Sequence, residues 1–116
     1  MFKKLRTVVY HVSDLQKAKE WYAKLTGVEP YFDELFYVGF DINGYELGLD
    51  PDFEDVLERG TQAVAYWKVE DIDEAVKNIS NAGAIISSKV KEVGEAVKVA
   101  TVIDPWGNAI GLIEES

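Results

Sequence analysis

A short motif occurs twice along the chain, and this repeat most limits the folds available to it. Residues Val12–Ala18 (VSDLQKA) match Val69–Ala75 (VEDIDEA) at the valine, the aspartate, one branched aliphatic residue and the alanine. A strand-like run precedes each copy, Arg6–His11 in the first and Thr61–Trp67 in the second. A repeat with the same surrounding elements predicts two copies of one supersecondary unit.

Each copy leads into a helical pattern. Apolar residues three and four positions apart predict helices over Leu15–Leu25 and Ile72–Ala82. Ser13 with Gln16 forms a capping box at the first start, and Gly27 ends that helix. Asp71 with Glu74 caps the second helix, which ends at Gly83.

Three strand-like runs follow each helix, so the predicted order is βαβββ twice. The runs are Pro30–Phe32, Leu35–Phe40, Tyr45–Leu49, Ala84–Ser88, Glu95–Ile103 and Ala109–Glu114. We expect one domain over residues 1–116, with modules at 1–50 and 61–116. Residues 51–60 are expected to connect the modules, and Pro51–Arg59 could form a short helix there. A sheet covered by one helix has one bare face, and two such modules predict an α+β fold with a shared cleft.

Composition excludes several classes of function. The formal charge of −9 argues against nucleic-acid binding and suits either a cationic ligand or simple solubility. The chain has no cysteine and a single histidine, His11, which excludes thiolate metal sites, disulfides and cysteine nucleophiles. No segment is typical of a signal peptide or a membrane span, so the expected compartment is the cytoplasm and no membrane partner is expected.

Two motifs resemble those of the vicinal oxygen chelate superfamily, which contains glyoxalase I, extradiol dioxygenases, fosfomycin-resistance proteins and bleomycin-binding proteins. They are VSDLQKA at the first helix and DPWGNAI, residues Asp104–Ile110, at the last hairpin. The resemblance extends over nearly the whole chain. It implies the two-module fold, a small-molecule ligand and a homodimer, but it does not specify a reaction.

The resemblance also implies where metal ligands lie in the metal-binding relatives. The matching positions in this chain are Thr7, Gly48, Val64 and Gly111, and a slip of one residue pair would put Glu46 in place of Gly48. These residues cannot assemble a divalent site, so no metal and no cofactor are expected. Gly48 and Gly111 either leave volume for a ligand or only relieve crowding in the strands.

Strand alternation sorts the residues that are expected to line the cleft. Val8, Tyr10 and Val12 should pack under the first helix, as should Ala65, Trp67 and Val69 in the second module. Phe36 and Tyr37 alternate along one strand, so one of the two is expected to face the cleft. The other nearby aromatic residues are expected either to add ligand surface or to be core or dimer contacts, and they are Tyr31, Phe32, Phe40, Tyr45 and Trp106. The predicted cleft residues are Thr7, Val9, His11, Tyr37, Glu46, Gly48, Val64, Tyr66, Lys68, Trp106 and Gly111.

The preferred interpretation is a metal-independent protein that binds a small molecule, similar to the bleomycin-resistance branch with its cationic drug. The alternative is a metal-dependent lyase, isomerase or dioxygenase of the glyoxalase type with shifted ligands. His11 and Glu46 are the candidate catalytic residues in that case, since an imidazole and a carboxylate can both act as bases or ligands. A third interpretation is a chain whose only role is its dimer surface.

Overall fold

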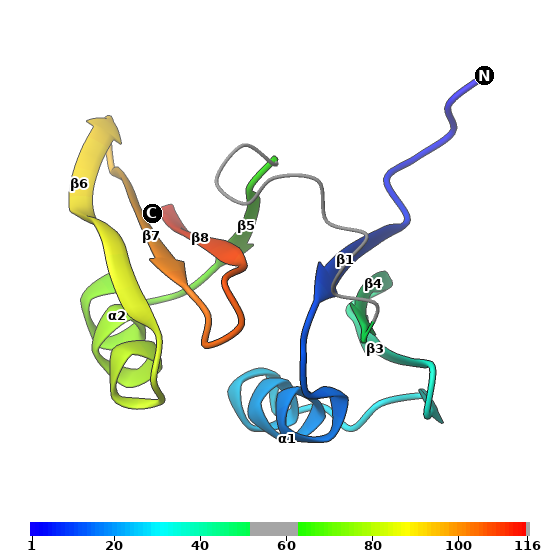
Figure 1. Ribbon diagram of the computed structural model, residues 1–116. Coiled ribbons are helices and arrows are strands. Elements are labelled where there is room, and N and C mark those ends of the chain that lie inside the picture. Colours follow the sequence, from blue (N-terminus) through cyan, green and yellow to red (C-terminus); the bar gives the residue numbers. More distant parts are fainter. Residues whose placement is uncertain (52–62, 116) are drawn as a thin grey trace. The chain divides into compact units, whose positions relative to one another are not determined.

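A computed structural model describes residues 1–51 and 63–115. It divides into two compact units, Met1–Leu57 and Glu58–Ser116. Each unit has the element order βαβββ in its described part, which confirms the predicted α+β class with two similar modules (Figure 1). The predicted connector helix at Pro51–Arg59 falls almost entirely outside the described residues.

The first unit is a four-stranded mixed sheet with one helix. Its elements are β1 Thr7–His11, α1 Leu15–Thr26, β2 Phe32–Glu34, β3 Tyr37–Ile42 and β4 Tyr45–Asp50. The strand order is β1-β4-β3-β2, with β1 parallel to β4 and the other neighbours antiparallel. The helix packs against β3 and β4.

The second unit repeats this arrangement. Its elements are β5 Ala65–Lys68, α2 Ile72–Asn81, β6 Ile85–Gly94, β7 Val97–Ile103 and β8 Ala109–Glu115. The strand order is β5-β8-β7-β6, and β5 runs parallel to β8. Helix α2 packs mainly on β6 and β7, beside which it lies in Figure 1.

The core of each unit lies between its sheet and its helix. Strand alternation places one apolar set on the helix side, and these side chains are buried. In the first unit they are Tyr10, Val12, Ala18, Tyr22, Val38, Phe40, Leu47 and Leu49. In the second they are Ile72, Val76, Ile79, Ala84, Ala100, Val102, Ile110 and Leu112. The opposite face of each sheet is therefore free to carry other chemistry.

The helix ends follow the predicted signals with one correction. The N-cap of α1 is Asp14, whose carboxylate accepts from the Lys17 amide at 3.1 Å. The predicted Ser13–Gln16 capping box is wrong, because the helix begins one residue later and Asp14 caps it through the Lys17 amide. Asp71 caps α2 as predicted, and Gly27 ends α1 in the left-handed region at φ 73°.

Several strand bounds differ from the predictions. Strand β2 begins two residues later than predicted, at Phe32, and β6 runs to Gly94 rather than Ser88. The register of β6 against β7 shifts at several points, and bulges of this kind obscure the alternation that sequence reasoning uses. Phe40, for which aromatic surface near the cleft and a place in the core were both open, is fully buried under α1 because it lies on the helix side of β3.

The last hairpin is held by a buried aspartate. The Asp104 carboxylate accepts from the backbone amides of Trp106 and Asn108 at 2.9 and 2.7 Å, and from the Asn108 side-chain amide at 2.9 Å. Asp104 and Asn108 are both buried, at 3% and 8% exposure. Gly107 takes φ 93°, which a residue with a side chain adopts only at a cost.

Candidate functional site

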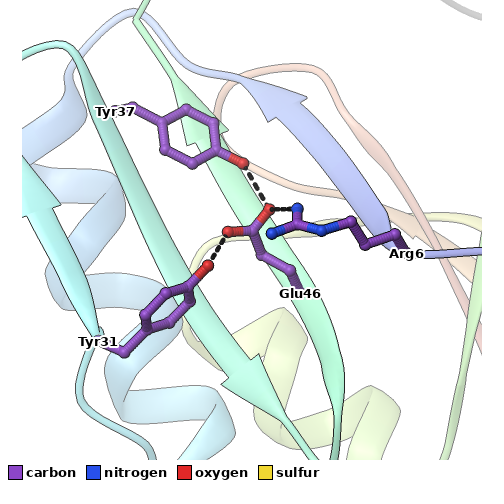
Figure 2. Close-up of polar contacts among 4 residues, drawn as sticks. All are labelled: Arg6, Tyr31, Tyr37 and Glu46. Atoms are coloured by element: carbon purple, nitrogen blue, oxygen red, sulfur yellow. Dashed lines mark hydrogen bonds and ion pairs between the residues drawn. The ribbon is translucent and has the colours of Figure 1, made fainter.

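A polar cluster lies on the face of the first sheet that α1 does not cover. Figure 2 shows Arg6, Tyr31 and Tyr37 converging on the carboxylate of Glu46. The Tyr37 hydroxyl donates to Glu46 Oε1 at 3.0 Å, and Arg6 Nη1 lies 3.2 Å from the same oxygen. The Tyr31 hydroxyl donates to the other oxygen, Oε2. The carboxylate is therefore bound from both sides by donors from three segments.

The strand register brings these residues together. Glu46 on β4 lies opposite Thr7 on β1 and opposite Asp41 on β3. The Glu46 amide also donates to the carbonyl oxygen of Arg6 at 3.1 Å, which continues the pairing beyond the end of β1. Tyr31 is placed by its own amide, which donates to the Gly39 carbonyl at 3.0 Å.

Two glycines opposite one another, Gly39 and Gly48, make room for the cluster. A Cβ atom on Gly39 would lie 2.7 Å from Glu46 Oε2 and 3.2 Å from the Tyr31 ring. A Cβ atom on Gly48 would overlap the Tyr37 hydroxyl and lie 2.6 Å from Cζ of that ring. The volume beside Gly48 is thus occupied by the protein's own tyrosine.

The cluster favours the ionised form of Glu46, whose side chain is only 10% exposed. Burial acts to raise the pKa of Glu46, but hydrogen bonds from Tyr31, Thr7 and Tyr37 and the charge of Arg6 together lower it. The pKa of Tyr31 is raised, chiefly by its hydrogen bond to Glu46. Burial first, and then Glu46, raise the pKa of Tyr37. These groups form a fixed negative charge held by neutral phenols.

An open pocket of about 270 Å³ adjoins the cluster. Its aromatic walls are exposed, Tyr31 at 58% and Tyr45 at 64%. The lining residues are Lys4, Arg6, Tyr31, Asp41, Gly44, Tyr45 and Glu46. The pocket therefore combines two cations, two carboxylates and two phenol rings.

The second unit has a glycine at the matching place, with different surroundings. Gly111 on β8 lies opposite Tyr66 on β5, as Gly48 lies opposite Val9. A Cβ atom on Gly111 would lie 2.6 Å from Cδ2 of Tyr66 and 2.8 Å from its Cγ. The Tyr66 ring occupies the space beside this glycine.

The predicted cleft residues fall into two groups. Those of the first unit are Thr7, Val9, His11, Tyr37, Glu46 and Gly48, and the structure brings Thr7, Tyr37, Glu46 and Gly48 together. Those of the second unit are Val64, Tyr66, Lys68, Trp106 and Gly111, of which Tyr66 and Gly111 are in contact. That the two groups line one cleft stays a prediction.

The two candidate catalytic residues lie at opposite ends of one strand pair. Glu46 lies opposite Thr7, whereas His11 lies opposite Asp50, four residues further along. At about 3.3 Å per residue their backbones are roughly 13 Å apart. Glu46 is also turned toward Tyr31 and Arg6 (Figure 2), so the structure does not bring the two side chains to one reacting atom.

The donors at the family's metal positions do not fit a divalent ion. Thr7, Gly48, Val64 and Gly111 offer one hydroxyl between them, whereas zinc or calcium requires several imidazole, carboxylate or carbonyl donors. Across residues 1–51 and 63–115, no group of three or more histidine, aspartate or glutamate side chains could hold an ion. Glu46, a single carboxylate hydrogen-bonded to two tyrosines and paired with Arg6, would not complete such a site by itself.

Sequence reasoning missed several members of this site. Arg6, Lys4 and Asp41 were not singled out, and Tyr31 and Tyr45 were expected only as nearby aromatic surface. Their place depends on the register that sets Glu46 opposite Thr7, which a single sequence does not provide. One feature of the sequence could have indicated the pair: Arg6 and Glu46 have opposite charges and stand at the starts of two strands, and opposite charges attract across neighbouring strands.

None of the helices among the described residues is long and apolar enough to cross a membrane.

Comparison with solved structures gives close matches of fold at low identity. A glyoxalase/bleomycin resistance protein/dioxygenase family enzyme from Burkholderia phytofirmans is similar with a TM-score of 0.83 and 16% identity, covering 98% of this chain and 100% of that chain. The fosfomycin resistance protein FosX from Listeria monocytogenes, complexed with Mn(II) and sulfate, gives 0.81 and 17%, covering 100% and 93%. Lactoylglutathione lyase from Agrobacterium tumefaciens gives 0.73 and 17%, covering 96% and 92%.

Sequence comparison agrees with the fold. No curated protein matches the chain. The family model described as the Glyoxalase/Bleomycin resistance protein/Dioxygenase superfamily matches residues 4–112, almost the full length. The chain therefore belongs to the glyoxalase/bleomycin resistance protein/dioxygenase superfamily.

Proposed function

We propose that the protein binds a small organic molecule without using a metal ion. The observation that carries this proposal is the state of Glu46, the carboxylate that a slip of one residue pair would put at a family ligand position. Its two oxygens accept hydrogen bonds from Tyr31, Tyr37 and Arg6, and among the described residues no group of three carboxylate or imidazole side chains gathers to hold a metal. The adjoining pocket, with two exposed phenol rings, instead supports contact with an organic ligand.

The sign of charge favours a cationic ligand. The chain carries a formal charge of −9, and a field of that sign raises the local concentration of cations near its surface. Phenol rings also attract cations placed over their faces. A cationic small molecule, of the kind that a drug-resistance protein sequesters, is the ligand class that these features support.

The test is a ligand screen carried out with and without a chelator. Protein purified without chelator is analysed for bound metal, and its melting temperature is measured against a panel of small cationic, neutral and anionic aromatic compounds. We expect less than stoichiometric divalent metal and a stabilisation by cationic compounds that persists in EDTA. A tightly held ion in stoichiometric amount, or stabilisation that requires added metal, would contradict the proposal.

The assembly is proposed as a homodimer, on the basis of the family resemblance. Light scattering coupled to size exclusion measures the mass directly, and a mass close to the 13.0 kDa of one chain would contradict this part. The metal-dependent alternative gains no specific support, since His11 and Glu46 lie at opposite ends of the β1–β4 pair.

A further inference from the structure

Arg6 is the most loosely held member of the Glu46 cluster. Its side chain is 70% exposed, whereas that of Glu46 is 10% exposed. Its one hydrogen bond to this carboxylate is 3.2 Å long, through Nη1, and it also interacts weakly with the Tyr31 side chain. An ion pair of this exposed kind holds its two side chains together only weakly.

The other hydrogen bonds to Glu46 are made without Arg6. Tyr31 and Tyr37 donate to different oxygens of the carboxylate, and Gly39 and Gly48 provide the space for both rings. If Arg6 swung away, Glu46 would keep these phenol hydrogen bonds and remain charged beside the pocket. The site would then present one oxygen, Oε1, with a donor missing.

We infer that Arg6 occupies the place of a cationic ligand, and that an organic amidinium, guanidinium or ammonium group binds Glu46 by displacing it. This inference rests on the proposed small-molecule function and names the group that the pocket recognises. The ligand's cation would donate to Glu46 Oε1, and its apolar part would lie against the exposed rings of Tyr31 and Tyr45. Arg6 would then act as an internal competitor.

The residues that line the pocket do not by themselves favour a ligand of either charge, because the charges of Lys4 and Arg6 cancel those of Asp41 and Glu46. The chain as a whole favours a cationic ligand, since its formal charge is −9. The opposite role for Arg6, direct binding of an anion, predicts the opposite effect of removing it. The sign of that effect decides between the two.

The experiment uses three compounds of nearly the same shape: benzamidine, benzamide and benzoate. Binding to the full chain is measured by titration while following amide NMR signals, including those of Gly44 and Glu46. The unmodified protein should bind benzamidine more tightly than benzamide or benzoate. Arg6→Gln should tighten benzamidine binding about two- to fivefold, the range expected for loss of an exposed ion pair.

Lys3→Gln is the matched control. Lys3 precedes the pocket residue Lys4, does not line the pocket, and its loss changes the net charge by the same amount as loss of Arg6. It should leave benzamidine affinity close to that of the unmodified protein. Glu46→Gln should weaken benzamidine binding roughly tenfold or more, because a charged hydrogen-bond acceptor is lost.

Several outcomes would overturn the inference. If Arg6→Gln binds benzamidine no more tightly than Lys3→Gln does, Arg6 does not compete with the ligand. The proposed function would still stand in that case, provided that the unmodified protein binds benzamidine. Preferred binding of benzoate, lost in Arg6→Gln, would make Arg6 an anion contact. If no compound of the wider panel binds any variant, the proposed function itself fails. Glu46→Gln may be omitted if it unfolds, since the comparison of Arg6→Gln with Lys3→Gln decides alone.

Discussion

The two units share a backbone plan but not a chemistry. Gly48 in the first unit and Gly111 in the second hold equivalent positions in the strand register. Gly48 pairs with Val9 and Gly111 with Tyr66, each on the parallel neighbouring strand. Counting from these glycines, Glu46 corresponds to Ala109, Tyr37 to Val99 and Thr7 to Val64. The polar positions of the first unit are therefore apolar in the second.

This difference separates the scaffold from the site. Both units keep the glycine on the last strand, and in both a tyrosine occupies the space beside it. Only the first of the two described sheets has a carboxylate next to that tyrosine, and only there does a charged cluster form. The glycine thus accommodates an aromatic ring in both units, while the Glu46 cluster belongs to the first.

The largest effect should come from filling the space beside the second glycine. Gly111→Ala places a methyl group 2.6 to 2.8 Å from three atoms of the Tyr66 ring, including Cγ near the backbone, so the whole ring must move. Overpacking of this kind costs about 1–3 kcal/mol of unfolding free energy. Chemical denaturation measures the loss.

The control for this substitution is Gly94→Ala, since no atom lies within 4 Å of a Cβ there. It should leave stability nearly unchanged. Tyr66→Ala in the Gly111→Ala background should recover part of the loss, because the two changes are coupled through one contact. A Gly111→Ala protein as stable as the Gly94→Ala protein would show that the ring does not fill this space.

A smaller effect is expected from Gly48→Ala in the first unit. Here the methyl group meets the end of the Tyr37 side chain, which can swing away at the cost of its hydrogen bond to Glu46. The expected loss is about 1 kcal/mol, the usual contribution of one hydrogen bond. The carboxyl NMR signal of Glu46 should shift as well. An equal loss for both glycines, with no change at Glu46, would remove the distinction between the units.

Acid should destabilise the first unit through Glu46. The folded-state pKa is lowered, so the unfolded protein binds the proton first as pH falls. The contribution of Glu46 is therefore present above its ordinary pKa of about 4.3 and is lost as pH falls through the lower folded value. Glu46→Gln should flatten this part of the profile, measured by melting temperature from about pH 6 to about pH 3. Identical profiles would mean that the cluster does not favour the charged form.

The smallest effect concerns the tyrosines at alkaline pH. Glu46 is the chief cause of the raised pKa of Tyr31, whereas burial is the chief cause for Tyr37. Glu46→Gln should lower the midpoint of Tyr31 more than that of Tyr37, as followed by NMR. Since both folded values lie above the ordinary value of about 10, their contribution to stability is intact below that pH and is lost as pH rises through the folded pKa. Equal shifts at both residues would contradict this assignment of causes.

Much of the fold could be predicted because its signals are local. The repeated VxD motif, the glycine and aspartate caps and the strand alternation together indicated two βαβββ modules. The caps failed only at Ser13, because the helix begins one residue later and Asp14 caps it by accepting from the Lys17 amide. The length of β6 was missed because its bulges interrupt the alternation.

The site was predicted less completely because it depends on contacts between distant residues. Parity could place Glu46 on the uncovered face, but it could not decide between Phe36 and Tyr37. Arg6 and Tyr31 reach Glu46 only through the register of β1 and the backbone pairing of Tyr31 with Gly39. The position of Phe40 shows the same limit. A strand pattern gives two faces, and only packing shows which one the helix covers.

The buried Asp104–Asn108 hairpin has a consequence for how relatives of this chain are recognised. The Asp104 carboxylate accepts hydrogen bonds from Trp106 and Asn108 within the same turn. The most recognisable motif in the sequence, Asp104–Asn108, therefore stabilises a backbone turn. Searches weighted toward that turn will gather proteins with the same architecture whatever they catalyse or bind, and sorting them by activity will require reading the strand positions around Glu46 instead.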